Sequence, residues 1–121
     1  HKGLHRGFVL HGEDVKECKT TYYGEYEQVV ALDGLFLATT AKTLQSIGID
    51  KPEHFEGEWD FYDIHYTTKA HLKGFKNYAV PIIVLHNSMG DIVGRDSWHK
   101  NRQAFIENTE LPLSLNSSNL L

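Results

Sequence analysis

Two side chains, Asp63 and His86, have the types and the predicted positions that could support chemistry. Asp63 falls in the first turn of a helix predicted from Asp60 to Lys73, and His86 ends an apolar run, residues 78–86, that predicts a strand buried on both faces. Ligands bind at the carboxyl ends of strands in α/β sheets, so both residues are expected near a site. A carboxylate there can act as a general base that deprotonates an attacking hydroxyl group, provided that it lies within ~3 Å of it.

Both residues also have structural explanations, which the sequence leaves open. An acidic residue in the first turn of a helix stabilises that end by roughly 0.3–1 kcal/mol through the helix dipole, and Asp60 is the expected N-cap. A histidine at a strand end can belong to the packed rim. As a ligand, His86 would suit Mn, Zn or another divalent ion. The sequence has no HExxH or CxxC pattern, so no structural zinc site is expected.

A turn and several aromatic residues supply candidate substrate contacts. Asp33 and Gly34 separate two apolar runs, residues 27–32 and 35–38, and predict a tight hairpin or bulge. The alternative is a turn that approaches a sugar closely, for which glycine leaves room. Three aromatic side chains could stack on a sugar, namely Trp59, Tyr62 and Trp98. Aromatic residues more often form the core.

The elements that would position these residues form a small mixed α/β sheet with two or three helices. Strands are predicted at residues 8–10, 27–32, 35–38 and 78–86, and helices begin at Thr39 or Thr40, at Asp60, and at Asp96 or Ser97. Gly48 and Gly74 are expected to end the first two helices. This pattern predicts a single domain over residues 1–112, followed by a tail at 113–121.

The expected core is apolar, and three histidines lie on or near the predicted helices. His65 borders the apolar face of the second helix, while His71 and His99 are expected to face solvent. The predicted core residues are Val9, Val30, Leu32, Leu35, Leu37, Leu44, Phe61, Ile64, Leu72, Ile83, Leu85, Phe105 and Ile106.

Composition limits the classes of function. The chain has 121 residues, a formal net charge of −4 and one cysteine, so neither a nucleic-acid partner nor a disulfide framework is expected. No apolar run approaches the ~18 residues of a membrane span. The N-terminal residues lack the apolar centre of a secretory signal, and a cytoplasmic location is expected. The sequence does not begin with methionine, which is compatible with a processed or excised piece of a longer protein.

Four segments resemble the second half of a family 2-like glycosyltransferase of the GT-A fold. They occur in the same order over about residues 29–106. The segments are VALDGLFLAT at 30–39, FEGEWDFYDIHY at 55–66, the run from Gly74 to His86, and Trp98 with Asn101, Arg102 and Phe105. The resemblance implies a partial GT-A architecture of the nucleotide-diphospho-sugar transferase type.

The resemblance implies a role for each matching residue. Asp63 would be the catalytic base, and His86 would help to hold a divalent metal, Mn or Mg, that binds the donor diphosphate. Transfer would be inverting, from a nucleotide-sugar to a hydroxyl group of a carbohydrate acceptor. The residues assigned to substrate binding are Asp33, Gly34, Trp59, Tyr62, Trp98 and Arg102.

The sequence departs from the family pattern in two respects. Relatives usually carry an acidic residue at the position of His65. Residues 1–28 contain no Asp-x-Asp metal motif, and the nucleotide-binding half expected before the matching region is not seen in the chain. We therefore expect a fragment or a split half that works with a partner chain or as a homo-oligomer. The alternative is a non-catalytic glycan-binding or structural module derived from a glycosyltransferase. A metal-dependent hydrolase built on the histidines is a third class, and their spacing does not favour it.

Overall fold

The computed structural model describes residues 8–11, 19–22, 27–57, 60–82, 84–87, 95–111 and 113, with only the backbone described for 8–11 and 19–22. This part of the chain contains three helices and five short strands, which confirms a small mixed α/β fold. The helices are α1 (Ala41–Ile47), α2 (Tyr62–Leu72) and α3 (Asp96–Asn108). The strands are β1 (Phe8–His11), β2 (Lys19–Tyr22), β3 (Glu27–Val29), β4 (Asn77–Ala79) and β5 (Leu85–His86).

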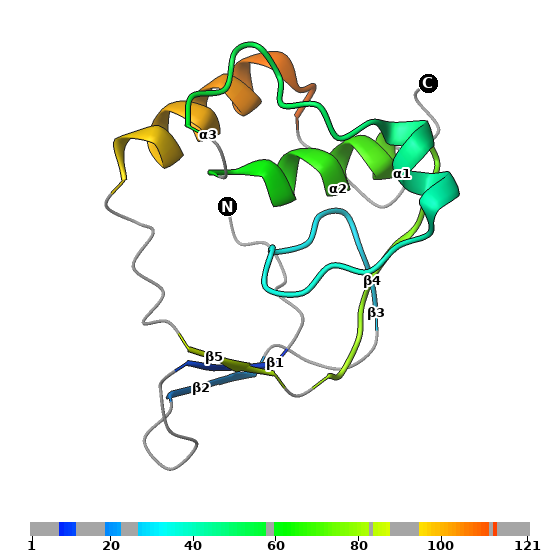
Figure 1. Cartoon of the computed structure of the whole chain (residues 1–121), viewed down its shortest axis with the longest axis vertical. Coiled ribbons are helices and arrows are strands. Elements are labelled where there is room, and N and C mark those ends of the chain that lie inside the picture. The colour runs from blue at the N-terminus through cyan, green and yellow to red at the C-terminus, as the bar shows by residue number, and fades with distance from the viewer. Residues whose placement is uncertain are drawn as a thin grey trace.

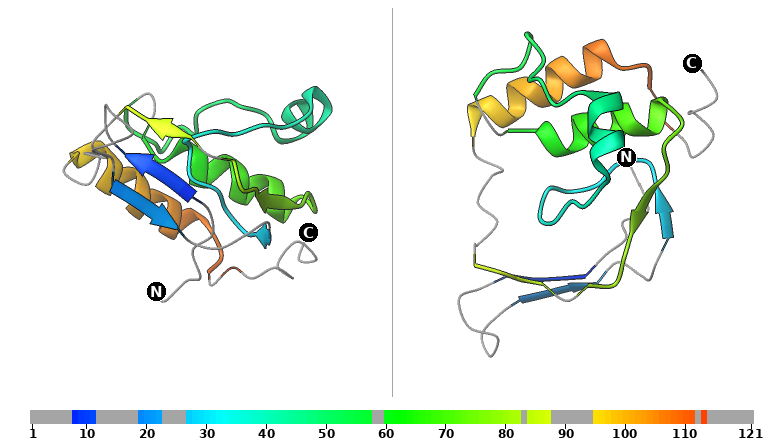
Figure 2. Two further views of the ribbon diagram at one scale, coloured as in Figure 1. Left: turned by 90° about the horizontal axis from the view of Figure 1, so that it is seen from below. Right: turned by 45° about the vertical axis from the view of Figure 1, so that its right-hand side comes forward.

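The strands form two separate sheets. In the first sheet the order is β2-β1-β5, with β1 antiparallel to β2 and parallel to β5; in the second, β3 pairs with β4 in antiparallel orientation. Figure 1 shows the three helices gathered on one side of the molecule and the first sheet on the opposite side, with the chain from β4 to β5 running between them. The two views of Figure 2 show the same arrangement.

The apolar run at residues 78–86 is not one buried strand, so this prediction is wrong. It divides into β4 and β5, which belong to different sheets. Between them the N–H of Ile82 donates to the carbonyl of Val80 at 2.8 Å, a tight turn centred on Pro81. Proline fixes its φ angle and has no N–H to give to a ladder, so the strand ends there. Val80 and Ile82 are both exposed.

The predicted strand at residues 35–38 is also absent, and with it the hairpin at Asp33 and Gly34. The chain turns at residues 34–36 and then continues without regular structure to Thr40. The N–H of Leu35 donates to Asp33 Oδ1 at 3.2 Å, a side-chain bond that favours a turn over a ladder. The turn therefore faces a helix and not a second strand.

Helix α1 confirms the predicted capping residues. The side chain of Thr40 accepts from the N–H of Thr43 at 3.2 Å, which satisfies a donor that the first turn leaves unpaired. At the other end Gly48 has φ +67 and donates its N–H to the carbonyl of Leu44 at 2.9 Å. Glycine adopts this left-handed conformation without a Cβ clash.

The core is aromatic and joins α2 to α3. Phe55, Phe61 and Phe105 are buried together, and Ile64 and Trp98 pack against them. Burial of Phe61 and Phe105 was expected from the sequence and is confirmed, whereas Phe55 and the likewise buried Ile47 were not predicted. Predicted core residues that are instead exposed are Leu37, Leu44, Leu85 and Ile106. The side chains of Val9 and Ile83 lie outside the described residues.

Helix α2 buries polar side chains as well as apolar ones. His71 is only 1% exposed, so the prediction that it faces solvent is wrong, and Thr68 is 2% exposed. Both lie on the face of α2 that the fold covers. Among the described residues, no helix is long and apolar enough to cross a membrane.

Candidate functional site

The N-cap of α2 is Phe61, one residue after the predicted cap Asp60, and it has an unusual conformation. Phe61 precedes the helix with φ 67, in the left-handed region, and its carbonyl accepts the N–H of His65 at 3.2 Å. For a bulky residue this conformation costs roughly 1–2 kcal/mol. The ring of Phe61 packs at 5.4 Å from Phe105 and 5.6 Å from Trp98, measured between ring centroids. This burial offsets the cost.

Asp60 is not the helix cap, which corrects the sequence prediction. Its carboxylate points to α3, where it accepts from the Ser97 hydroxyl and lies 3.5 Å from Nη1 of Arg95. The Arg95 side chain is 62% exposed, so solvent weakens that ion pair. The start of α2 is therefore held by tertiary contacts and not by a local side-chain cap.

Asp63 is in the first turn of α2, as predicted, and its carboxylate meets the turn at Gly34. Oδ2 of Asp63 accepts the N–H of Gly34 at 2.7 Å, and Oδ1 accepts the N–H of Ile64 at 2.8 Å. The Tyr62 hydroxyl donates to the carbonyl of Gly34 at 3.3 Å. Three residues predicted from two distant segments, Gly34, Tyr62 and Asp63, thus lie together.

The contact between the turn and the helix leaves no room for a side chain at residue 34. A Cβ placed on Gly34 would lie 2.5 Å from the Tyr62 hydroxyl oxygen and 3.0 Å from Asp63 Oδ2. Real Cβ atoms do not approach an oxygen so closely, so a side chain at residue 34 would displace the Tyr62 ring or the turn. Glycine is needed here for close approach of the backbone and not for a positive φ.

A second contact continues the same interface one helical turn further along α2. The N–H of Leu32 donates to Thr67 Oγ1 at 3.0 Å, and the Thr67 hydroxyl donates to the Asp63 carbonyl at 2.6 Å. Residues four apart on a helix are separated by ~6 Å along its axis, and residues two apart on an extended chain by ~6.6 Å. The spacing between Asp63 and Thr67 along the helix therefore matches the spacing between Gly34 and Leu32 along the extended segment.

Asn77 closes this interface at the start of β4. Its Nδ2 group donates to the carbonyl of Val30 and to that of Thr67, both at 2.7 Å. The side chain thus joins the segment that leads into the turn to the same helix. Neither Thr67 nor Asn77 was predicted from the sequence, because neither belongs to a catalytic motif.

Burial alters the acid–base properties of the site. Desolvation raises the pKa of Asp63 above its usual value, opposed by the hydrogen bonds from Ile64 and Gly34, and the nearby charge of Asp33 raises it further. Desolvation also raises the pKa of Tyr62, and the charges of Asp63 and Asp33 add to this effect. A carboxylate with a raised pKa is a stronger base.

The remaining predicted site residues are distributed over other parts of the structure. Asp33 is exposed beside Gly34, and Arg102 is exposed on α3. Trp98 is partly buried against Phe61 and belongs to the core. Trp59 lies outside the described residues.

His86 lies in the first sheet, which Figure 1 shows across the molecule from the helices. The parallel pairing of β5 with β1 places the backbone of His86 in register with that of His11, at the carboxyl ends of both strands. Within the part of the chain that the structure describes, no three His, Cys, Asp or Glu residues are grouped closely enough to hold a metal ion.

Asn101 is a further residue that the sequence did not indicate as structural. It is 1% exposed on α3. Its Nδ2 group donates to the carbonyls of Glu56 at 2.6 Å and Asp60 at 2.9 Å, and its Oδ1 accepts the N–H of Glu56 at 2.5 Å. Asparagine four residues before a buried phenylalanine, on one helix face, is the signal that could have identified it.

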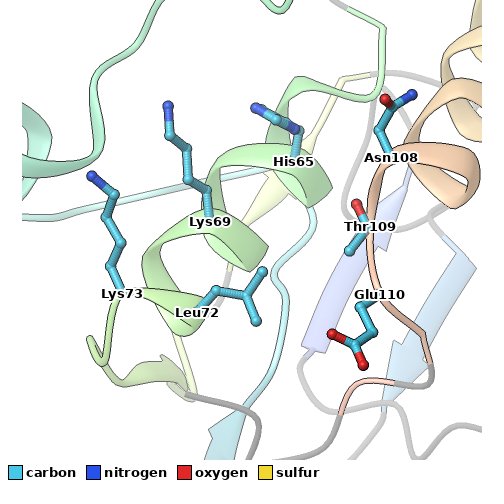
Figure 3. A pocket seen from close by; sticks show the side chains of 7 residues that line it. All are labelled: His65, Lys69, Leu72, Lys73, Asn108, Thr109 and Glu110. Carbon is cyan, nitrogen blue, oxygen red and sulfur yellow. The ribbon is translucent and has the colours of Figure 1, made fainter. Parts of the chain in front are cut away.

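The opposite side of α2 carries a shallow basic pocket of about 300 Å³. Figure 3 shows His65, Lys69 and Lys73 on one side of the helix, with residues 108–110 across from Leu72. Desolvation, and secondarily the charge of Lys69, lowers the pKa of His65 to about 4. The Lys73 ammonium group donates to the Ser46 carbonyl at 2.6 Å. This pocket thus lies away from the face of α2 that bears Asp63.

Comparisons with protein-family models, with curated proteins and with solved structures give no match to this chain.

Proposed function

We propose that the chain is the acceptor-side half of an inverting glycosyltransferase with partial GT-A architecture, in which Asp63 is the catalytic base. The observation that carries this proposal is the 2.7 Å hydrogen bond from the N–H of Gly34 to Asp63 Oδ2. It joins two of the segments on which the resemblance rests. A turn that must lie close to a base and to an acceptor explains the requirement for glycine as well as the position of the carboxylate.

The proposed role of the chain's own residues follows from their contacts. Gly34 orients one oxygen of Asp63 and Ile64 orients the other, so the carboxylate has a defined direction. Desolvation raises its pKa, which increases its affinity for the proton of an acceptor hydroxyl group. The exposed Asp33 carboxylate beside it would accept hydrogen bonds from further hydroxyl groups of a sugar.

The donor is a nucleotide-sugar, and its binding requires residues beyond those described. A divalent ion, Mn or Mg, would supply charge neutralisation of the leaving diphosphate when bound. His86 is the proposed ligand in this chain, and the register of His11 with His86 brings a second histidine residue to the same sheet edge. A second copy or a partner chain would contribute the remainder of the donor site.

A non-catalytic role is the second candidate, and one observation favours it. Each Asp63 oxygen already accepts a backbone N–H, so the side chain would be needed to hold the turn against α2 even without chemistry. A glycan-binding or structural module would retain these contacts. The two candidates differ in whether nucleotide diphosphate is released.

The first experiment is thermal denaturation with UDP, GDP and dTDP, each with and without Mn²⁺. A ligand that binds only the folded chain raises the melting temperature by an amount that follows ~RT ln(1 + [L]/Kd). A metal-dependent shift with one nucleotide is the expected result. The matching nucleotide-sugar is then incubated with saccharide acceptors, and release of nucleotide diphosphate is measured.

The control for the second step is Asp63→Asn. If the wild-type chain and this variant release nucleotide diphosphate at the same rate, Asp63 is not the base. If no nucleotide changes the melting temperature, with or without metal, the chain has no donor site of its own, which leaves a binding module or a fragment that requires its other half.

A further inference from the structure

We propose that Asn101, together with the face of α3 on which it lies, is a positioning element that sets the direction of the Asp63 carboxylate. This inference rests on the proposed function for its catalytic meaning, but its structural content can be tested without any activity. Asn101 contacts neither Gly34 nor Asp63 in any described interaction. Its effect passes through the turn that precedes α2.

The residues of α3 that contact the turn at Asp60 and Phe61 lie on one face of the helix. Ser97, Asn101 and Phe105 are spaced four residues apart, so they lie in one row along the helix. Ser97 bonds to the Asp60 carboxylate. Asn101 donates to the Asp60 carbonyl at 2.9 Å.

Phe105, with Trp98 beside it, holds the ring of Phe61. The backbone and the side chain of residue 60 and the ring of residue 61 are thus all held by the same helix. This face of α3 is therefore the external support of the turn.

The turn needs such support because its conformation is unfavourable. Phe61 has φ 67 and α2 has no side-chain cap, and the local hydrogen bond from the N–H of Ile64 to Asp63 Oδ1 does not hold Phe61 itself. A non-glycine residue persists in this region only when its surroundings impose it, and such residues are concentrated at functional sites. Phe61 contributes the carbonyl for the first helical hydrogen bond, to the N–H of His65.

A change at the turn would be transmitted to Asp63. Asp63 is only two residues beyond Phe61, in the first helical turn, and its two short hydrogen bonds depend on the direction in which that turn points. Asn101 fixes the Asp60 carbonyl from a site that is 1% exposed. The angle at which α2 leaves the turn, and therefore the contact of Asp63 with Gly34, is set from α3.

The experiment compares Asn101→Ala with Asn108→Ala by NMR. Asn108 is the matched control, because it is on the same helix, is exposed, and its side chain donates within the described part of the chain to the carbonyl of Ala104 in its own helix, at 2.8 Å. The two readouts are the pKa of the Asp63 carboxyl group and the hydrogen-exchange rate of the Gly34 amide. A purely structural loss of stability at α3 would leave the pKa of Asp63 in the folded chain unchanged, and it would speed the exchange of many amides together and not that of Gly34 in particular.

In Asn101→Ala we expect the Asp63 carboxyl group to be more hydrated. Its pKa should therefore fall, because desolvation is the largest cause of the raised value and outweighs the opposing loss of the Gly34 hydrogen bond. We expect the Gly34 amide to exchange faster by about tenfold or more, because its acceptor is displaced. Asn108→Ala should leave both signals unchanged. Ser97→Ala removes a weaker part of the same support and should produce a smaller change in the same direction, which provides the test if Asn101→Ala does not fold.

The proposal would be overturned if folded Asn101→Ala showed the wild-type Asp63 pKa and the wild-type exchange rate of the Gly34 amide. If Asn101→Ala does not fold, the same result in Ser97→Ala would overturn it. A wild-type chain that transfers no sugar, while Asn101→Ala still shifts the Asp63 pKa, would contradict the proposed function and leave the positioning role intact.

Discussion

The N–H of Gly34 lies 2.7 Å from Oδ2 of Asp63, although the two residues are 29 positions apart in the chain. This bond connects a partly buried turn to the first turn of a helix, where a carboxylate would otherwise cap only its own backbone. It gives Asp63 a fixed orientation and a partly desolvated environment at the same time. The predictions below test what this arrangement does for stability and for chemistry.

Replacement of Asp63 by Asn is expected to lower glycosyl transfer by ~10²-fold or more, because an amide cannot take the proton of the acceptor hydroxyl group. The amide has one acceptor oxygen in place of two, so either the Gly34 or the Ile64 N–H loses its partner. The free energy of unfolding should fall by ~1 kcal/mol. Urea denaturation and nucleotide diphosphate release measure the two effects.

Asp96→Asn is the control for the charge effect alone, since Asp96 is an exposed acidic residue in the first turn of α3. It should cost no more than ~1 kcal/mol, the usual size of a helix-dipole interaction, and should not alter transfer. Equal loss of transfer in both variants would contradict the assignment of Asp63 as base.

Gly34→Ala is expected to destabilise the fold by ~1–3 kcal/mol, because the added methyl group would lie 2.5 Å from the Tyr62 hydroxyl oxygen. The measurement is the midpoint of urea denaturation. In a Tyr62→Phe background the closest atom is gone, and the cost of Gly34→Ala should be smaller. An equal cost in both backgrounds would show that the Tyr62 hydroxyl is not the obstacle.

Thr67→Val should lower the free energy of unfolding by ~1–2 kcal/mol, because the N–H of Leu32 loses its acceptor in a partly buried position. Thermal or urea denaturation gives the value. The adjacent Thr68→Val is the matched control, since Thr68 is 2% exposed and its hydroxyl has no hydrogen-bond partner among the described residues. That substitution should be neutral or stabilising, and a larger loss in Thr68→Val than in Thr67→Val would contradict the contact with Leu32.

His65 should make the fold sensitive to acid. Its pKa in the folded chain is about 4, below the ordinary value of ~6.5 of an unfolded chain, so the unfolded state binds its proton first. The stabilisation from neutral His65 is complete above pH ~6.5 and is lost as the pH falls toward 4. Since the ring is only half-buried, solvent screening limits the loss to ~1–2 kcal/mol.

Urea denaturation of the wild type and of His65→Phe between pH 4 and 8 measures this contribution as a difference. Phenylalanine keeps an aromatic ring beside Phe55, whose centroid is 5.2 Å from that of His65. Asp63 acts in the opposite sense, because its raised pKa favours the folded state at low pH and this stabilisation is lost as the pH rises through that pKa. Both proteins contain Asp63, so its contribution cancels when the unfolding free energy of one protein is subtracted from that of the other. Parallel pH curves would contradict the prediction for His65.

The sequence by itself determined the features that depend on neighbouring residues. The capping pattern of Thr40 and Gly48 defined α1, and the helical periodicity placed Asp63 in the first turn of α2. Caps, glycine stops and helix propensity act within a few residues, so they can be recognised in a sequence. The mixed α/β class followed from the order of these elements.

Only the tertiary structure decided which elements meet. The run at residues 78–86 is apolar enough for a buried strand, yet it is divided at Pro81 between two sheets and is largely exposed in its described part. His71 is buried, although histidine as a residue type is only intermediate in its tendency to be buried. Burial depends on what packs against a residue from distant parts of the chain, and the local pattern does not contain that information. The contact of Gly34 with Asp63 is of this kind: the sequence supplied a glycine and a carboxylate, and the packing of the turn on α2 brought them together.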